Sequence, residues 1–211
     1  MTGQISRNAT RLLVATTNPD KLREIRAILG RLPVEILTLQ DLDPVPEPEE
    51  TGTTFADNAR LKARYYDRAL DRTEGERPFT VAEDSGLVID ALEGAPGVHS
   101  ARFLGPDASY PERFAEIDRR LEAVPAAKRR ARFICALTVV RRSEIVFETT
   151  GTVEGEVAES PKGTRGFGYD PIFYYPPYGR TLGEVTDDEK RRVAHRGEAF
   201  RRLAMWLEKG M

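Results

Sequence analysis

Apolar residues are grouped along this chain in two ways, as short continuous runs and as positions that recur at helical spacing. Runs rich in branched residues predict buried strands, and they lie at 11–16, 34–37, 80–82, 87–89, 131–140 and 144–153. A short turn, Arg141–Ser143, joins the last two runs and predicts an antiparallel hairpin. Helical spacing predicts helices after Asn18, after Thr54, from Pro111 to Leu121, after Thr186 and after Gly197.

The first strand leads directly into a polar turn and then a helix. Asn18 is a natural N-cap and Pro19 a natural first helical residue. Such a turn directs backbone N–H groups and the positive end of a helix dipole at one point, which suits a phosphate. Lys21 in the first helical turn is unfavourable for that dipole, unless an anion is held there. A plain cap with a solvated lysine is the alternative interpretation.

Two adjacent carboxylates, Glu83 and Asp84, lie between two apolar strand runs and are followed by Ser85 and Gly86. Acids beside a buried strand need compensation for the water that they lose. A divalent cation such as Mg²⁺ supplies it, because hard cations prefer carboxylate oxygens. The alternative is a polar turn between two strands, in which Gly86 supplies a positive φ.

Further polar and aromatic positions follow turns or begin helices. Arg102 follows the specific turn 94–97 and could reach a phosphate, and a glycine next to Phe167 allows a flat ligand to lie against the ring. His195 and Arg196 stand at a helix N-terminus. A surface arginine, a core phenylalanine and a capping histidine are the structural alternatives.

Composition limits the possible classes of protein. The 211 residues carry a net charge of −2, and 31% are charged, which is ordinary for a globular protein and argues against binding nucleic acid without sequence preference. The one cysteine, Cys135, forms no intrachain disulfide. No apolar run has the length of a membrane span, and the N-terminus lacks the apolar region of a signal peptide, so we expect a cytoplasmic protein.

Taken together, these features predict a site for a nucleotide polyphosphate with Mg²⁺. At this point the chain resembles the inosine triphosphate pyrophosphatase family, from about Leu12 to Leu207. The motifs that carry the resemblance are Ala15–Lys21, Thr51–Ala59 with Lys62, Glu83–Leu87, Gly94–Gly97, Phe167–Pro171, Lys190 and His195–Arg196.

The resemblance implies an α/β fold with an elongated central mixed sheet, flanking helices and two lobes around a substrate groove. We expect a flexible segment over 1–10 and one domain of two lobes over 11–209. The family is usually homodimeric and removes non-standard purine nucleotides from the nucleotide pool. The implied reaction is hydrolysis of ITP, dITP or XTP to the nucleoside monophosphate and pyrophosphate.

The resemblance also implies roles for individual residues. Asp84 would be the general base, and Asp57, Glu83 and Asp84 would hold Mg²⁺. The triphosphate would be held by Thr16, Thr17, Asn18, Pro19, Asp20, Lys21, Lys62, Ser85 and Arg102. The base would be bound by Phe167, Gly168, Tyr169, Asp170, Lys190, His195 and Arg196, with Phe167 stacked on it.

The chain departs from the family pattern at three positions. The family usually has Glu where this chain has Asp57, and Asp where it has Glu83, so the hypothesis is that the metal shifts toward the strand of Glu83. Ala194 replaces a serine that often precedes His-Arg. Two other functions stay open: a Maf-type pyrophosphatase acting on modified nucleotides, and a nucleotide sensor without catalysis.

Overall fold

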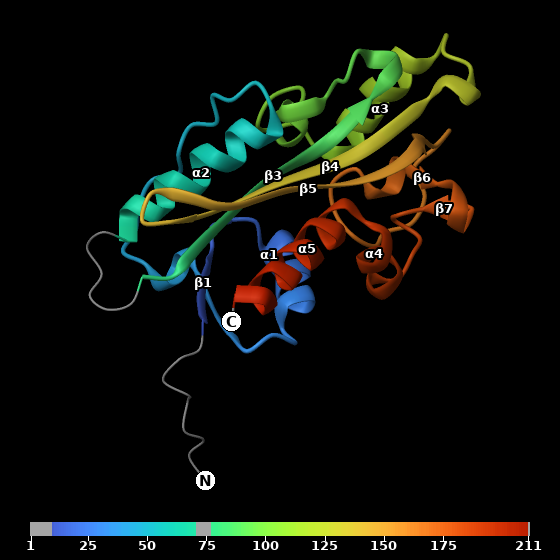
Figure 1. The fold of residues 1–211 in the computed structure, drawn as a ribbon. Coiled ribbons are helices and arrows are strands. Elements are labelled where there is room, and N and C mark those ends of the chain that lie inside the picture. The colour runs from blue at the N-terminus through green and yellow to red at the C-terminus, as the bar shows by residue number, and fades with distance from the viewer. Residues whose placement is uncertain (1–9, 71–76, 211) are drawn as a thin grey trace. The chain divides into compact units, whose positions relative to one another are not determined.

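The computed structural model describes residues 10–70 and 77–210, and it contains a seven-stranded sheet with helices. The strands are β1 Thr10–Val14, β2 Val34–Thr38, β3 Phe79–Ile89, β4 Arg130–Arg141, β5 Glu144–Val157, β6 Phe173–Tyr175 and β7 Arg180–Thr181. The α-helices among the described residues are α1 Pro19–Leu29, α2 Phe55–Ala69, α3 Tyr110–Leu121, α4 Asp187–Val193 and α5 His195–Gly210 (Figure 1).

The strands are ordered β2-β1-β3-β4-β5-β6-β7 in one open sheet. β1 pairs in parallel with β2 and with β3, whereas β5 with β6 and β6 with β7 are antiparallel. Parallel pairing of β1 with its neighbours requires crossover connections, and α1 and α2 supply them. The sheet is therefore mixed and has flanking helices, which confirms the predicted α/β class.

The described residues divide into two compact units. The first runs up to Asp84 and includes Ala136–Thr149 and the chain from Ala199 onward, and the second holds Ser85–Cys135 and Thr150–Glu198. Residues 1–9 of the predicted flexible segment lie outside the described residues, and Thr10 begins β1. The extent of the predicted domain over 11–209 stays a prediction.

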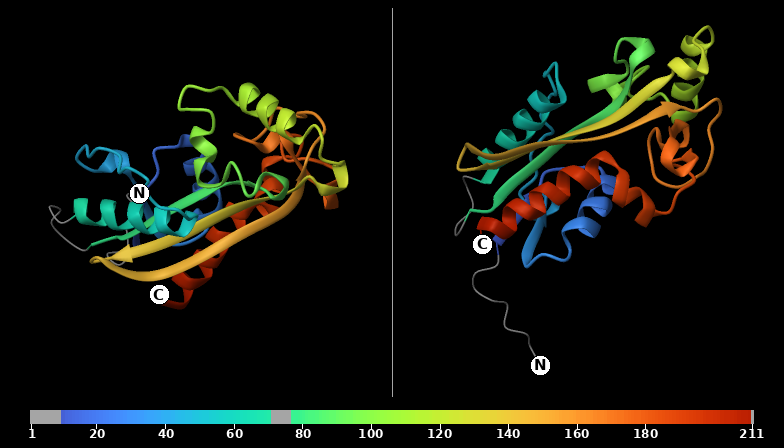
Figure 2. Two further views of the ribbon diagram at one scale, coloured as in Figure 1. Left: turned by 90° about the horizontal axis from the view of Figure 1, so that it is seen from above. Right: turned by 45° about the vertical axis from the view of Figure 1, so that its right-hand side comes forward.

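In the first unit, α2 covers one face of the strands, and α1 and α5 cover the other (Figures 1 and 2). The side chains of Ala63 and Tyr66 on α2, and of Leu70 at its C-cap, pack against Leu13 and Ala82 of the sheet. These helix positions are three or four residues apart, which places them on one side of the helix. In the second unit, a separate core joins α3 to the sheet strands through residues that include Ile117, Leu121, Leu87 and Phe173.

The prediction of two short strands around Glu83–Gly86 was wrong, because β3 runs unbroken from Phe79 to Ile89. The glycine marks close packing instead of a turn. A Cβ on Gly86 would lie 2.3 Å from Oγ of Ser100, and the next residue, Leu87, donates its N–H to that oxygen at 2.9 Å. Both acids therefore stand in the middle of a strand.

The β4–β5 hairpin is confirmed. Arg142 and Ser143 form its two-residue turn with φ values of 52° and 67°, the conformation of a type I′ turn. The buried Asp67 of α2 accepts the N–H of Ser143 at 2.8 Å, which ties the turn to the helix. β5 continues to Val157, four residues beyond the predicted run 144–153.

The predicted helix starts after Asn18, Thr54 and Thr186 are also confirmed. α3 begins at Tyr110, one residue before the predicted Pro111, and α5 begins at His195, earlier than the predicted start after Gly197. Oδ1 of Asn18 accepts the N–H groups of Asp20 and Lys21 at 2.9 and 3.1 Å, and Pro19 is the first helical residue. Thr54 accepts the N–H of Asp57 at 3.1 Å, and Thr186 forms a capping box with Glu189.

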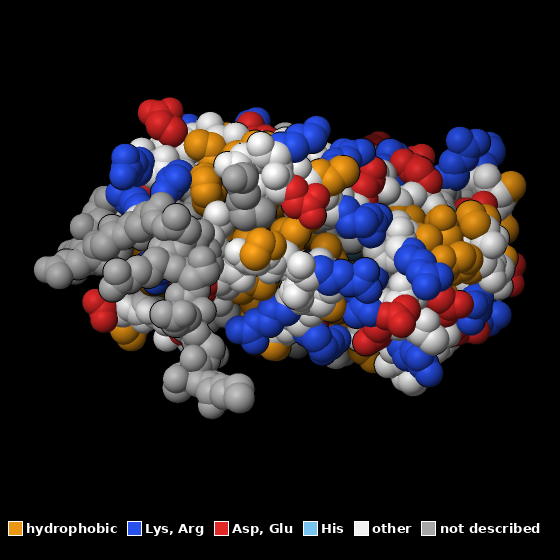
Figure 3. Space-filling model, turned by 60° about the horizontal axis from the view of Figure 1, so that its bottom comes forward, with side chains coloured by type: hydrophobic (Ala, Val, Ile, Leu, Met, Phe, Trp, Pro, Cys, Tyr) orange, Lys and Arg blue, Asp and Glu red, His pale blue; other side chains and the backbone are white. Residues whose placement is uncertain are grey.

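The surface carries charges of both signs. On the face in Figure 3, lysine and arginine side chains lie among aspartates and glutamates, in keeping with the small net charge. Within 10–70 and 77–210, no helix is both long enough and apolar enough to cross a membrane.

Candidate active site

The start of α1 brings a lysine to an acid of β3. Nζ of Lys21 lies 3.0 Å from Oε1 of Glu83, and the Glu83 side chain is only 2% exposed. Thr16 accepts the N–H of Asn18 at 3.2 Å, and the exposed Thr17 donates its hydroxyl to Glu47 at 2.6 Å. The predicted turn therefore forms, and a carboxylate already balances its lysine.

On the opposite face of the strands, two residues of α2 contact Asp84. The side-chain amide of Asn58 donates to Oδ2 at 3.0 Å, and Nζ of Lys62 lies 3.5 Å from Oδ1. Lys62 also donates to Glu50 at 2.6 Å. Because Asn58 and Lys62 are four residues apart on a helix, they share one face. One ammonium group thus stands between the carboxylates of Asp84 and Glu50.

Burial changes the titration of this cluster. It raises the pKa of Asp84 above its ordinary value; Lys62 opposes this, Glu50 adds to it, and the Asn58 hydrogen bond opposes it. Burial by itself would lower the pKa of Lys62, but the carboxylates of Asp84, Glu50 and Glu83 raise it overall. Lys62 is therefore a charged partner, and Asp84 is a carboxylate that binds a proton more readily than usual.

The neighbouring acids do not form a shared pair. Successive strand residues point to opposite faces, and Glu83 meets α1 whereas Asp84 meets α2. Among the groups that change the pKa of Asp84, Glu83 accordingly has the smallest effect, and the effect of Glu50 is larger. Burial, and not repulsion by Glu83, is therefore the main cause of the raised pKa of Asp84.

Asp57 is not brought to Asp84. Its side chain is 45% exposed, accepts the hydroxyl of Thr54 at 2.7 Å and lies 3.6 Å from Arg60. The helix turns by about 100° per residue, so Asp57 points away when Asn58 faces the strand. In the part of the chain that the structure describes, no three acid, histidine or cysteine side chains are grouped to hold a metal ion. The predicted three-carboxylate group is therefore not assembled.

In the second unit, Phe167 lies among cations. Nζ of Lys190 is 4.5 Å and Cζ of Arg196 is 5.4 Å from the centre of its ring. Oδ2 of Asp170 accepts from Nζ of Lys190 at 2.5 Å and from the N–H of Phe167 at 2.8 Å. The ring is half-buried, while Asp170, Lys190 and Arg196 are nearly inaccessible. The cluster thus holds one flat, partly exposed face beside fixed donors.

Ser85 belongs to this second cluster, since its hydroxyl accepts from Arg196 at 2.8 Å. It was predicted to hold phosphate, whereas here it orients the arginine. Arg102 is partly exposed and ends the short 3₁₀ segment Gly97–Arg102. The phosphate-binding residues predicted from sequence are therefore divided: Thr16–Lys21 and Lys62 lie in the first unit, and Ser85 and Arg102 in the second.

The remaining predicted base-binding residues are packed into the second unit. His195 is buried and its ring stacks on Phe133, with centroids 4.9 Å apart. Tyr169 is 4% exposed and donates its hydroxyl to the carbonyl of Ser100 at 2.8 Å, and burial raises its pKa. Gly168 adopts a φ of 65°, which favours glycine. Tyr169 and His195 therefore support the cluster from within the core.

Two residues of the first cluster, Asn58 and Glu50, were not among the predicted site residues. Asn58 lies in the motif Thr51–Ala59, but no role was predicted for it. Its spacing of four residues from Lys62 is the signal that could have identified it. Glu50 lies in the proline-rich segment 43–50, which has no periodicity that would indicate where its side chain points.

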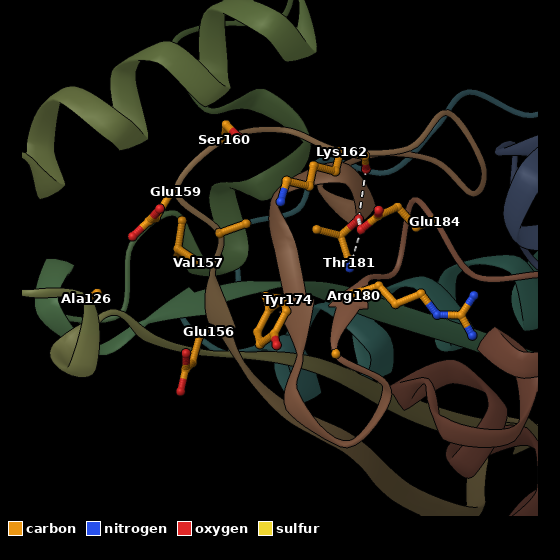
Figure 4. Close-up of a pocket in the computed structure, with 12 residues that line it drawn as sticks. Ala126, Glu156, Val157, Glu159, Ser160, Lys162, Tyr174, Arg180, Thr181 and Glu184 are labelled. Atoms are coloured by element: carbon orange, nitrogen blue, oxygen red, sulfur yellow. Dashed lines mark hydrogen bonds between the residues drawn. The ribbon is translucent and has the colours of Figure 1, made fainter.

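A separate hollow of about 320 Å³ in the second unit is lined by none of the predicted site residues. Figure 4 shows Lys162 directed into it, whereas the guanidinium of Arg180 points away. Arg180 donates to Glu189 at 2.8 Å, so the cations at this hollow do not converge on one point.

The fold and the two clusters define an α/β protein with lysines and carboxylates arranged for an anionic substrate, and with an aromatic ring held among cations. Residues 12–206 match the model of the Ham1 family. The chain therefore belongs to that family, and the resemblance seen in its motifs is confirmed.

The relatives extend over nearly the whole chain. The dITP/XTP pyrophosphatase of Exiguobacterium sibiricum is 43% identical over 197 residues, which cover 92% of this chain and 94% of that protein. A HAM1 protein from Coxiella burnetii is 37% identical, with a TM-score of 0.84 and coverage of 95% and 99%. The nucleoside-triphosphatase (dITP/XTP pyrophosphatase) of Mycobacterium abscessus is 38% identical, with a TM-score of 0.72 and coverage of 92% and 98%.

Proposed function

We propose that this protein hydrolyses the non-standard purine nucleotides ITP, dITP and XTP to the nucleoside monophosphate and pyrophosphate. The observation that carries the proposal is the cluster of Lys62, Asp84 and Glu50, a buried carboxylate with a charged lysine at contact distance. The curated relatives named dITP/XTP pyrophosphatases, which share 43% of residues with this chain, support the same substrate class.

Asp84 acts as the general base in this proposal. Water attacks the α-phosphorus, its proton passes to the carboxylate, and the α–β anhydride bond breaks with pyrophosphate as the leaving group. Lys21 and Lys62 balance the negative charge that grows on the departing oxygens. The N–H groups of Asp20 and Lys21 are already bound by Asn18, so α1 favours the phosphates through the positive end of its dipole and through Lys21.

The second cluster recognises the base. The purine stacks on Phe167, and Arg196, which Ser85 orients, donates to the keto oxygen at position 6. Adenine carries an amino group at that position and would leave the donor without a partner. Sites that depend on such a hydrogen bond reject the wrong substrate by as much as ~10⁴- to 10⁵-fold.

Mg²⁺ fits the first cluster in a different way from the one predicted. Asp84 and Glu50 already share one cation, the ammonium of Lys62, so two carboxylates face a common point. Mg²⁺ needs only one or two carboxylates when phosphate oxygens and water complete its shell. We propose that Asp84 and Glu50 hold it, and that Glu83 instead fixes Lys21. When bound, Mg²⁺ supplies charge neutralisation at the phosphates.

Replacing Glu50 tests this metal assignment. Glu50→Gln is expected to raise the Mg²⁺ concentration at half-maximal activity by about 10- to 100-fold, because one of two carboxylates is lost. Asp57→Ala should raise it by less than about 3-fold, well below the loss expected for a metal-site residue. Thermal unfolding in pyrophosphate, recorded against Mg²⁺ concentration, gives a second readout that does not depend on turnover. Equal shifts in both variants would contradict the assignment.

A nucleotide panel tests the function itself. Pyrophosphate release is expected to be fastest with ITP, XTP and dITP, and about 10²-fold or more slower with ATP, which cannot accept the donor. Faster release from a modified pyrimidine or methylated nucleotide would favour the Maf-type alternative. Binding of ITP without release of pyrophosphate would favour the nucleotide sensor.

We also infer a homodimer, which the family resemblance supports. Analytical ultracentrifugation of the full chain checks this, and a single species at the mass of one chain, 23.7 kDa, would contradict it. The cytoplasmic location stays a prediction.

A further inference from the structure

The buried side-chain amide of Asn58 forms a hydrogen bond at each end. The residue is 0% exposed, its amide N–H donates to Oδ2 of Asp84 at 3.0 Å, and its Oδ1 accepts the N–H of Gly52 at 2.8 Å. Buried amides are normally satisfied in this way. The contact that matters is the first, because its acceptor is the carboxylate assigned as the base.

The loop fixes which end of the amide faces Asp84. A backbone N–H can only donate, so Gly52 requires the oxygen of Asn58 on its side and leaves the NH₂ group for the carboxylate. A Cβ on Gly52 would lie 2.5 Å from Oδ1 of Asn58, and therefore only glycine allows this approach. The backbone N–H of Asn58 donates to the carbonyl of Thr54 at 3.2 Å, so its position on α2 is also held by the helix.

The contacts of Asp84 divide between its two oxygens. Oδ2 receives the amide of Asn58, whereas Oδ1 faces Lys62 at 3.5 Å. Glu50 and Glu83 are the other charged groups that act on this carboxylate. The neutral donor thus fixes Oδ2, and Oδ1 is the oxygen that faces the charged group of Lys62 and Glu50.

We propose that Asn58 is a positioning residue that holds the carboxylate of Asp84 in its reactive orientation and fixes it to the Thr51–Gly52 loop. The residue touches neither substrate nor metal in this assignment and acts only through Asp84. The inference rests on the proposed role of Asp84 as the base. Small errors in the placement of a reacting group can cost about 10²-fold in rate.

Two substitutions separate the two contacts. Asn58→Ala removes both, and Asn58→Asp keeps an acceptor for Gly52 but has no amide to donate to Asp84. For pyrophosphate release from ITP with Mg²⁺, both variants are expected to lower kcat by about 10- to 100-fold with KM changed by less than about 3-fold. Amide exchange at Gly52 should remain slow in Asn58→Asp and become faster in Asn58→Ala.

The matched control is Asp67→Asn, another buried polar residue of α2 whose side chain contacts Ser143 and Arg77. It lies about 14 Å further along the helix axis. We expect a lower unfolding midpoint with kcat unchanged, which is the pattern of a purely structural residue. The proposal is overturned if folded Asn58 variants keep the wild-type kcat. It is also overturned if kcat and KM change together, in proportion to the loss in free energy of unfolding.

Two further measurements keep the outcomes distinct. If Asp84→Asn retains full turnover, the role of Asp84 fails; if it loses turnover while both Asn58 variants keep it, only the positioning role fails. Should Asn58→Ala not fold, the side-chain amide protons of Asn58 in the wild type decide the question. They should exchange slowly and shift in Asp84→Asn, and rapid exchange would overturn the proposal.

Discussion

Asp84→Asn is expected to lower pyrophosphate release from ITP by about 10²- to 10⁴-fold, the contribution of a positioned general base. The amide has the size of the carboxylate and can still accept the hydrogen bond from Asn58, but it cannot take a proton from water. Because Asp84 is also a proposed Mg²⁺ ligand, the Mg²⁺ requirement should rise too, whereas Lys21 and Lys62 remain to hold the triphosphate. The measurement is kcat and KM at saturating Mg²⁺, compared with wild type.

The same substitution is expected to keep or raise the unfolding midpoint at neutral pH. Burial raises the pKa of Asp84 in the folded protein, so ionising it costs folding free energy above the pKa of the unfolded chain. A neutral amide avoids that cost. The difference in stability from wild type should shrink as the pH falls and Asp84 becomes protonated. Loss of turnover together with a lower midpoint would indicate misfolding, and unchanged turnover would contradict the role as base.

The local elements could be predicted from the sequence because each start has its own signal. Asn18 and Pro19 determine where α1 begins, and Thr54 does the same for α2. The hairpin followed from two long apolar runs separated by a short polar turn. Such signals depend only on neighbouring residues, so they can be recognised without knowledge of the fold.

The continuity of β3 could not be predicted, because its reason lies elsewhere in the chain. Four residues, Glu83 to Gly86, have the composition of a turn. Ser100 and Gly97 pack against Gly86, and Lys21, Lys62 and Arg196 meet the polar side chains on their respective faces. These partners come from distant segments, and together they make a polar strand stable.

The candidate site shows the same limit. Residue types and motifs indicated the lysines, Asp84 and the Phe167 cluster. They gave no information on where each side chain points. Asp57 was therefore predicted as a site residue in place of its neighbour Asn58, and Glu50, which lies in a loop, was not predicted. Strand alternation and helical spacing, applied to Glu83–Asp84 and to Asn58–Lys62, would have corrected part of this.

The second large effect is expected for Asp170→Ala. Asp170 is 2% exposed and its carboxylate accepts from Lys190, itself 4% exposed, and from the N–H of Phe167. Removing one partner of a buried ion pair leaves a buried charge without its counter-charge, which costs about 3–5 kcal/mol. We expect the free energy of unfolding, measured in urea, to fall by that amount, with KM for ITP raised as the Phe167 loop loses its anchor.

Two comparisons separate the buried charge from simple loss of a contact. Asp188→Ala removes an exposed partner of Arg191 on the same helix as Lys190, and should cost no more than about 1 kcal/mol. In Asp170→Ala/Lys190→Met the buried ammonium is absent, so much of the lost stability should return. The raised KM should persist in the double variant, because neither group is then present to hold Phe167. An Asp170→Ala cost equal to that of Asp188→Ala would show that the buried pair contributes no more than an exposed one.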